Sequence, residues 1–291
     1  KRLPNSQTIQ KLIEKLNTEF QANYPQKSVN DLIQLKKALD AYKVDSKNPQ
    51  AANHAYWIAQ KQKEVKDLII ACAGIWVDAY SNQSQQVVNQ EFTYQVEAIV
   101  RNPEVQVELV NINNQNVQYN FQTNNLWRGS ANTKLNKTSQ PYWLDEPNTL
   151  GKFNIPIENV GYPTNPEHAH ATFTLKINGE PISITQEIQH RYVDPVKGEV
   201  HNPLVILPEL TVETSSSILL SKNQEQKIIE VTFTRHDKSK KAFEVNIPAL
   251  EGWEISESKW ILNFSNENSI VKTLTLKPLS ERSNNGTLRF Q

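Results

Sequence analysis

The sequence predicts a mainly β protein with an N-terminal helical segment, in which about three α-helices precede two antiparallel β-sandwiches. Apolar residues recur at steps of three and four in the first part of the chain, the spacing of one helix face. Later they recur at every second residue, the spacing of a half-buried strand. A length of 291 residues also exceeds that of one ordinary domain. We therefore expect a helical segment over 1–83, a first β-sandwich over 84–205 and a second over 206–291.

Three stretches carry the helical spacing. The first predicted helix covers 6–20, and the second has its apolar face at Leu32, Leu35 and Leu39. Ser28 followed by Asp31 predicts a capping box at the start of the second helix. The third and longest helix is predicted over 51–80, with an apolar stripe formed by Ile58, Val65, Leu68, Ile69, Cys72, Ile75 and Trp76. These helices could pair with one another or bury their apolar faces against a domain outside this sequence.

The first β region begins after residue 86, where the period changes to two. Alternating stretches at 92–100, 105–109 and 171–177 predict strands with one apolar face. The Asn178–Pro181 stretch predicts a hairpin turn. The Asp194–Glu199 stretch predicts another turn, because Pro195 presets φ and Gly198 can adopt a positive φ.

The second β region follows an expected domain boundary that is bracketed by Pro203 and Pro208. It alternates at 229–233, 243–247, 260–264 and 274–276, and it ends with Leu288 and Phe290. This spacing is typical of an immunoglobulin-like domain of about 100 residues. We expect both β regions to be immunoglobulin-like sandwiches, and we expect Trp253 and Trp260 to be packing residues of the second.

Charge and composition limit the classes of partner. Lys+Arg and Asp+Glu are both 31, so the formal net charge is zero, and a nucleic-acid or anionic-membrane partner is not expected. No apolar run has the length of a membrane span. Cys72 is the single cysteine, and its place on a helical apolar stripe predicts a buried, inert thiol. Because the sequence starts at Lys1 and contains no methionine, we expect a fragment of a longer protein.

Histidine spacing suggests one metal hypothesis. His168 and His170 are two residues apart, so on a strand both would point to one face and could bind zinc. A third ligand is not specified by spacing; the candidates are Glu167, Asp194, Glu199 and His201. The alternative is that both histidines are ordinary polar residues at the start of a strand, and this is the interpretation we favour. The sequence contains no nucleophile elbow, phosphate loop or His-Glu-x-x-His motif.

Aromatic residues suggest a second hypothesis. Trp127, Tyr142 and Trp143 lie among polar residues, and exposed rings of this kind can stack on sugar rings in glycan-binding sandwiches. Tyr142 and Trp143 follow Pro141, however, so they could instead close a sandwich as a structural plug. We favour the plug and keep ligand contact as the alternative.

The stretches Ser139–Leu144, 157–184 and 190–213 together resemble the C-terminal region of large bacterial PIG-L-type (LmbE-like) N-acetylglucosamine deacetylases. The matching residues are Pro141, Tyr142, Trp143, Leu144, Gly161, Pro163, Asp194, Pro195, Val196, Gly198 and Glu199. The final β region is similar to the immunoglobulin-like NPCBM-associated domain found beside glycosidases. The resemblance is strongest over 86–212 and looser on either side.

The resemblance implies an accessory region without its catalytic domain. The zinc motif of that family, Ala-His-Pro-Asp-Asp-Glu, is not present in this sequence, so no catalytic or zinc residue carries over. We accordingly expect no cofactor here, and zinc in the missing catalytic domain. The implied partners are that N-terminal domain and, as a second candidate, a glycan. The implied location is periplasmic or extracellular. The alternative function is an autonomous carbohydrate-binding or adhesion module.

Overall fold

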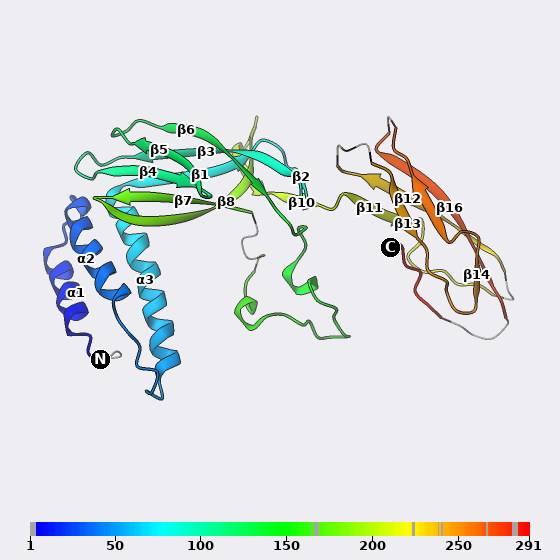
Figure 1. Cartoon of the computed structure of the whole chain (residues 1–291), viewed down its shortest axis with the longest axis horizontal. Helices are drawn as coiled ribbons and strands as arrows, with labels where there is room; N and C mark the ends of the chain where they lie inside the picture. The colour runs from blue at the N-terminus through cyan, green and yellow to red at the C-terminus, as the bar shows by residue number, and fades with distance from the viewer. Residues whose placement is uncertain are drawn as a thin grey trace. The chain divides into compact units, whose positions relative to one another are not determined.

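The computed structural model describes residues 4–163, 165, 169–222, 225–237, 239, 241–265, 267–280 and 285–291. It is mainly β, with three α-helices preceding the strands in the described part of the chain, as predicted (Figure 1). The chain forms two compact units. The first unit comprises Lys1–Ser84, Glu91–Thr133 and Pro141–Leu204; the second comprises Gln85–Gln90, Lys134–Gln140 and Val205–Gln291. No helix in the described ranges has the length and apolarity needed to cross a membrane.

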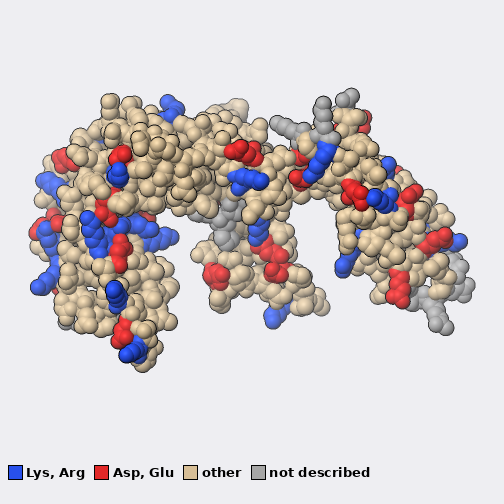
Figure 2. Space-filling model, viewed as in Figure 1, with Lys and Arg blue, Asp and Glu red and all other residues tan. Residues whose placement is uncertain are grey.

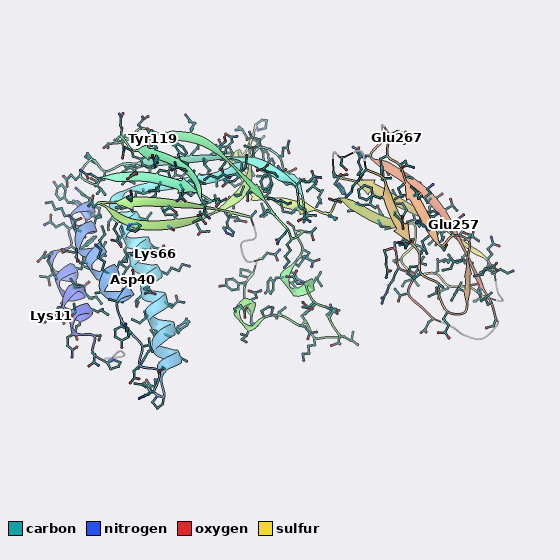
Figure 3. The ribbon with its side chains drawn as sticks, in the orientation of Figure 1. Lys11, Asp40, Lys66, Tyr119, Glu257 and Glu267 are labelled. Atoms are coloured by element: carbon teal, nitrogen blue, oxygen red, sulfur yellow. The ribbon has the colours of Figure 1, made fainter. Side chains whose placement is uncertain are left out.

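The helices of the first unit pack on one another, which is the first of the two alternatives left open by the sequence. They are α1 (Gln7–Glu19), α2 (Val29–Asp40) and α3 (Ala51–Ala73). The predicted α2 residues Leu32, Leu35 and Leu39 are buried. Helix α2 is also joined to the strands of the same unit, because Lys36 Nζ lies 2.9 Å from Glu180 Oε1. The labelled Asp40 and Lys66 in Figure 3 mark α2 and α3.

Three helical predictions were wrong. The third helix ends at Ala73, because Gly74 adopts φ +67° and stops it, and the next residues form a strand. Leu68, assigned to the buried stripe, is 50% exposed. Ser28 makes no capping hydrogen bond. A 3₁₀ turn, η1 (Pro25–Ser28), leads directly into α2, so Ser28 already has helical backbone angles, whereas an N-cap residue requires an extended backbone.

The first unit contains an eight-stranded sheet in the order β5-β4-β7-β8-β1-β3-β6, with β9 paired to β8. Its side chains that are almost fully buried include Tyr94, Leu109 and Phe173. One pair, β1 with β8, is parallel, so the sheet is not purely antiparallel as predicted. The strands are β1 (Ile75–Ser81), β3 (Glu91–Val100), β4 (Val107–Ile112), β5 (Gln115–Asn120), β6 (Trp127–Lys134), β7 (His170–Ile177), β8 (Glu180–Asp194) and β9 (Gly198–Pro203).

Both predicted turns of this unit are present. Asn178 and Gly179 join β7 to β8 with φ +47° and +84°, and a two-residue hairpin turn of this type requires two positive φ angles. Asp194 pairs with Gly198 at the turn between β8 and β9, and Gly198 has φ +78°. The Asp194 carboxylate accepts hydrogen bonds from the N–H groups of Val196 and Lys197.

The two end strands of the sheet, β5 and β6, approach each other, so that the sheet is nearly barrel-like. The carboxamide of Gln115 on β5 joins them: its Nε2 donates to the Asn132 carbonyl (2.9 Å), and its Oε1 accepts from the Asn132 N–H (3.3 Å). A side-chain amide thus replaces a backbone partner along this seam. Tyr119, labelled in Figure 3, lies on β5 against Trp127 of β6.

Removing the Gln115 carboxamide is therefore expected to loosen the seam. Gln115→Ala should lower the free energy of unfolding by about 1 kcal/mol, because water replaces the two hydrogen bonds at this exposed position. Hydrogen exchange of the Asn132 amide should become faster. Gln122→Ala, also at an exposed position, is the matched control. Unchanged exchange at Asn132 would contradict this role of Gln115.

The second unit has strands in two antiparallel sheets that share one core. The larger sheet has the order β11-β12-β16-β14, and the smaller pairs β13 with β15. Phe233 and Trp260, one from each sheet, meet edge to face at 5.6 Å. The strands are β11 (Leu210–Thr214), β12 (Lys227–Arg235), β13 (Phe243–Asn246), β14 (Trp253–Ile255), β15 (Lys259–Leu262) and β16 (Ser269–Pro278). A separate parallel pair joins β2 (Gln85–Val87) to β10 (Val205–Leu207).

The packing predictions for this unit hold. Trp260 is buried in the core, and Trp253 packs against it. Leu288 and Phe290 also pack against this core, but they lie outside any strand. Only Gln291 continues the ladder, through two backbone hydrogen bonds with Asn246.

Candidate functional site

The Pro141–Leu144 part of the resemblance begins an irregular segment of the first unit. Pro141, with φ −56°, precedes a 3₁₀ turn, η2 (Tyr142–Leu144). The Tyr142 N–H donates to Asn165 Oδ1, and the Tyr142 hydroxyl donates to the Tyr162 carbonyl, each over 2.9 Å. Tyr142 is 8% exposed. It therefore fastens the two ends of the segment to each other, as a structural plug would.

Trp143 is placed differently from its neighbour. It is half-buried, and its ring meets the Tyr142 ring edge to face, with centroids 5.1 Å apart and planes at 83°. The two rings thus do not form the coplanar surface on which a sugar chain would stack. The paired carboxylates of Asp145 and Glu146 follow directly in the same segment.

Between the two ends held by Tyr142, the segment 144–162 presents apolar side chains to solvent. It contains one further 3₁₀ turn, η3 (Ile157–Asn159), and one isolated bridge between Thr149 and Lys152. The exposed apolar residues, with their exposed fractions, are Leu144 (47%), Leu150 (107%), Phe153 (49%), Ile157 (84%), Val160 (56%) and Tyr162 (55%). A long irregular segment with this many exposed apolar side chains is typical of an interaction surface.

Trp127, the third aromatic candidate, has a structural environment. Its ring lies over Gly129 on the same strand, where an added Cβ would be 2.6 Å from Trp127 Cη2. Only glycine leaves room for the ring in this position. The other side of the ring faces Tyr119, with centroids 5.9 Å apart, so Trp127 also joins β6 to β5.

The two histidines of the metal hypothesis are not brought together with a third ligand in the part of the chain that the structure describes. His168 lies outside the described residues, and His170 is exposed at the start of β7. His201 lies instead beside Glu199, with Nε2 and Oε1 2.9 Å apart. No group of three or more His, Cys, Asp or Glu side chains suited to a metal occurs among the described residues.

A charged cluster on the large sheet was not anticipated from the sequence. Asp78 on β1 and Glu97 on β3 are directly opposite in the antiparallel register, and both are buried. The Arg191 guanidinium on β8 bridges them, because its Nη1 lies 3.1 Å from Asp78 Oδ2 and 3.1 Å from Glu97 Oε2. Arg191 also lies over the Tyr80 ring at 3.2 Å, and Arg128 Nε donates to Glu97 Oε1.

The cluster is arranged to keep Glu97 ionised. Burial acts to raise the pKa of this carboxyl, but the hydrogen bonds and charges of Arg191 and Arg128 outweigh it and lower the pKa below the ordinary value of 4.5. A sequence signal was present in the polar residues that interrupt the apolar strands β1 and β3. It did not identify the partner, because Arg191 is 113 residues from Asp78 along the chain.

The single cysteine is not activated for nucleophilic chemistry. Cys72 is buried on α3, and burial raises the pKa of its thiol, so the thiolate that would react is disfavoured. The space-filling view in Figure 2 shows charged side chains of the first unit on the helices and on the irregular segment, while much of the visible sheet surface is uncharged. The segment 144–162 is thus the strongest candidate functional site in the described residues.

Comparison with known proteins does not assign a family. No family model matches the chain, and no curated protein matches it. Among solved structures it is similar to a red sea bream transglutaminase, with 12% identity and a TM-score of 0.32 over 76% of this chain and 30% of that chain. A Pseudomonas fluorescens alkylpurine DNA glycosylase bound to DNA gives 9% identity and a TM-score of 0.21, over 60% of this chain and 50% of that chain. A Salmonella alpha-2-macroglobulin gives 12% identity and a TM-score of 0.24, over 72% of this chain and 14% of that chain. TM-scores this low carry no argument about fold or function.

Proposed function

We propose that this chain is the accessory, non-catalytic C-terminal region of a zinc-dependent N-acetylglucosamine-type deacetylase, and that its segment 144–162 docks against the catalytic domain. The observation that carries the proposal is the exposure of six apolar side chains on a segment whose two ends are held together by Tyr142. Burying such a surface against a partner domain removes apolar area from water. The resemblance in the residues Pro141–Leu144 and Asp194–Glu199 supports the choice of partner.

The immunoglobulin-like character of the β regions belongs to the same proposal. For the second unit it is supported by two antiparallel sheets that contribute to one core. The first unit offers less support, because its sheet includes a parallel pair and its end strands meet through Gln115. A periplasmic or extracellular location follows from the proposed family and has no separate support.

The alternative, an autonomous carbohydrate-binding module, has weaker support from the rings. Tyr142 is buried, Trp143 stands edge-on to it, and Trp127 packs over Gly129. A row of coplanar exposed rings would have favoured glycan stacking. We therefore retain the docking function as the proposal.

The test compares this chain with the longer protein that contains it. The reading frame that encodes this chain should also encode, upstream of Lys1, a domain with an Ala-His-Pro-Asp-Asp-Glu motif. This chain by itself should not deacetylate N-acetylglucosamine derivatives. In the full-length protein, backbone amides of 144–162 should exchange hydrogen more slowly than in this chain. Equal exchange in the two proteins, or deacetylation by this chain, would refute the proposal.

Variants of the full-length protein separate docking from general surface effects. Leu150→Ser with Ile157→Ser should abolish the added protection of 144–162, because both side chains are at least 84% exposed in this chain and contribute little to its own core. Ile228→Ser with Ile261→Ser is the matched control, since these side chains are 63% and 59% exposed in the second unit. A loss of protection in the control pair as well would show that the segment does not act through its own apolar residues.

A further inference from the structure

A cavity of about 800 Å³ opens beside the core of the second unit. Its floor is formed by Ile229 and Leu276, which are buried members of that core. Leu219, Leu250 and Trp253 contribute to its walls. This volume lies within the range of about 300–1,000 Å³ that is usual for small-molecule sites. The cavity therefore exposes to a ligand the same apolar interior that stabilises the unit.

Irregular chain and two glycines border the cavity. The residues from Ser216 to Lys222, which follow β11, line one side without forming a strand. Gly252 and Gly286 lie on its border and contribute no side chain. At Gly286 an added Cβ would meet Leu250 Cδ1, so a larger residue here would displace the end of the Leu250 side chain.

The chemistry of the lining indicates the class of ligand. The deep surface is aliphatic and aromatic, whereas serine and threonine hydroxyl groups and Lys222 lie among the remaining lining residues. The described lining residues include no Asp, Glu, His or Arg. Lys222 is an exposed residue and the one cation among the described lining residues, so it is the group in this lining that would pair with an anion.

A sugar fits this lining poorly. Sugar hydroxyls require a dense set of carboxylate and amide partners, and the described lining offers one amide side chain, Asn285. An alkyl chain gains free energy from each methylene group that it buries against leucine and isoleucine. A terminal anion can then pair with Lys222 while the hydroxyl groups bind water or the head group.

We propose that this cavity binds an alkyl chain with an anionic head group, either as a free fatty acid or as part of a membrane lipid. The proposal goes beyond the accessory function and does not depend on it, because the cavity is built entirely from the second unit. The apolar interior supplies the affinity, and Lys222 selects the anion.

Calorimetric titration of this chain with octanoate, decanoate and dodecanoate tests the proposal. Each additional pair of methylene groups should strengthen binding about tenfold, as burial of an alkyl chain requires. Dodecanol, which lacks the anion, should bind more weakly than dodecanoate. No binding, or affinity that does not depend on chain length, would overturn the proposal.

Two variants and a matched control locate the site. Leu219→Asp places a carboxylate on the apolar wall and should reduce dodecanoate affinity at least about tenfold. Leu279→Asp introduces the same change at a 63% exposed leucine outside the lining and should leave affinity unchanged. Lys222→Gln, a change at an exposed position, should remove the preference for dodecanoate over dodecanol. Equal affinity of Leu219→Asp and the parent chain would overturn the assignment.

A vesicle experiment distinguishes the two sources of the ligand. The cavity would be assigned to a membrane lipid if phosphatidylglycerol vesicles compete with dodecanoate and if Leu219→Asp prevents the binding of both the vesicles and dodecanoate. Binding of dodecanoate with no competition from vesicles would assign it to a free fatty acid. Vesicle binding that Leu219→Asp leaves intact would count against the cavity as the binding site.

Discussion

Replacing Arg191 with methionine is expected to lower the free energy of unfolding of the first unit by about 3–5 kcal/mol, the range observed when one partner of a buried ion pair is removed. Asp78 and Glu97 are directly opposite on neighbouring strands, and their side chains are 8% and 9% exposed. Without the guanidinium, two like charges would face each other with little contact with water. Chemical denaturation of the variant and the parent chain measures the difference.

Arg128→Met is the matched control for this prediction. Arg128 contacts the same Glu97 carboxylate over 3.0 Å, but its side chain is 69% exposed. An exposed ion pair contributes about 0–1 kcal/mol, so this variant should lose much less stability. If both methionine variants lost the same stability, the burial of the Arg191 cluster would not be the cause.

The effect of Arg191→Met should also depend on pH. In the parent chain the pKa of Glu97 is lowered below 4.5, so its ionic contacts stabilise the fold above that value and are lost as the pH falls through the lower, folded pKa. In the variant, Arg128 alone opposes the effect of burial, so the pKa of Glu97 should rise and this carboxyl should bind a proton at higher pH than in the parent chain. The difference in stability should therefore be largest near neutral pH, begin to shrink where Glu97 of the variant binds its proton, and go on shrinking as the pH falls through the lower pKa of Glu97 in the parent chain. A difference that grows in acid would contradict this account.

Replacing Tyr142 with alanine is expected to release the segment 144–162 from the first unit. Deletion of a buried aromatic side chain costs about 3–5 kcal/mol, and here it also removes the hydroxyl group that holds the Tyr162 carbonyl. The backbone N–H that donates to Asn165 Oδ1 is kept in the variant. Limited proteolysis and hydrogen exchange should show faster cleavage and exchange throughout 144–162. The helices and the large sheet should keep their protection, because Tyr142 lies outside both.

Two further variants separate the ring from the hydroxyl group. Tyr142→Phe removes one hydrogen bond to the Tyr162 carbonyl and should cost about 1 kcal/mol. Trp143→Ala, at a half-buried position, should release the segment less than Tyr142→Ala does. If Trp143→Ala released the segment and Tyr142→Ala did not, the assignment of Tyr142 as the plug would be wrong.

Much of the local structure could be predicted because it depends on neighbouring residues. The period of apolar residues identified α2, β3 and β7, and the Asn178–Gly179 turn follows from the need for positive φ angles. The error over 74–80 has the same local origin, since apolar residues continue past Gly74 and a single residue with φ +67° ends the helix. The resemblance drew attention to Tyr142 and Trp143, but it did not distinguish the buried ring from the half-buried one.

By itself, the sequence determined that the protein is mainly β with helices at its N-terminus, because each helix or strand responds to the spacing of residues within it. Only the tertiary structure decided which distant residues meet. Arg191 lies between two carboxylates 113 and 94 residues away, Gln115 joins the end strands of a curved sheet, and the second unit leaves a cavity beside its core. These contacts depend on strand order and register, which arise from the burial of the whole apolar surface and not from any single stretch of chain.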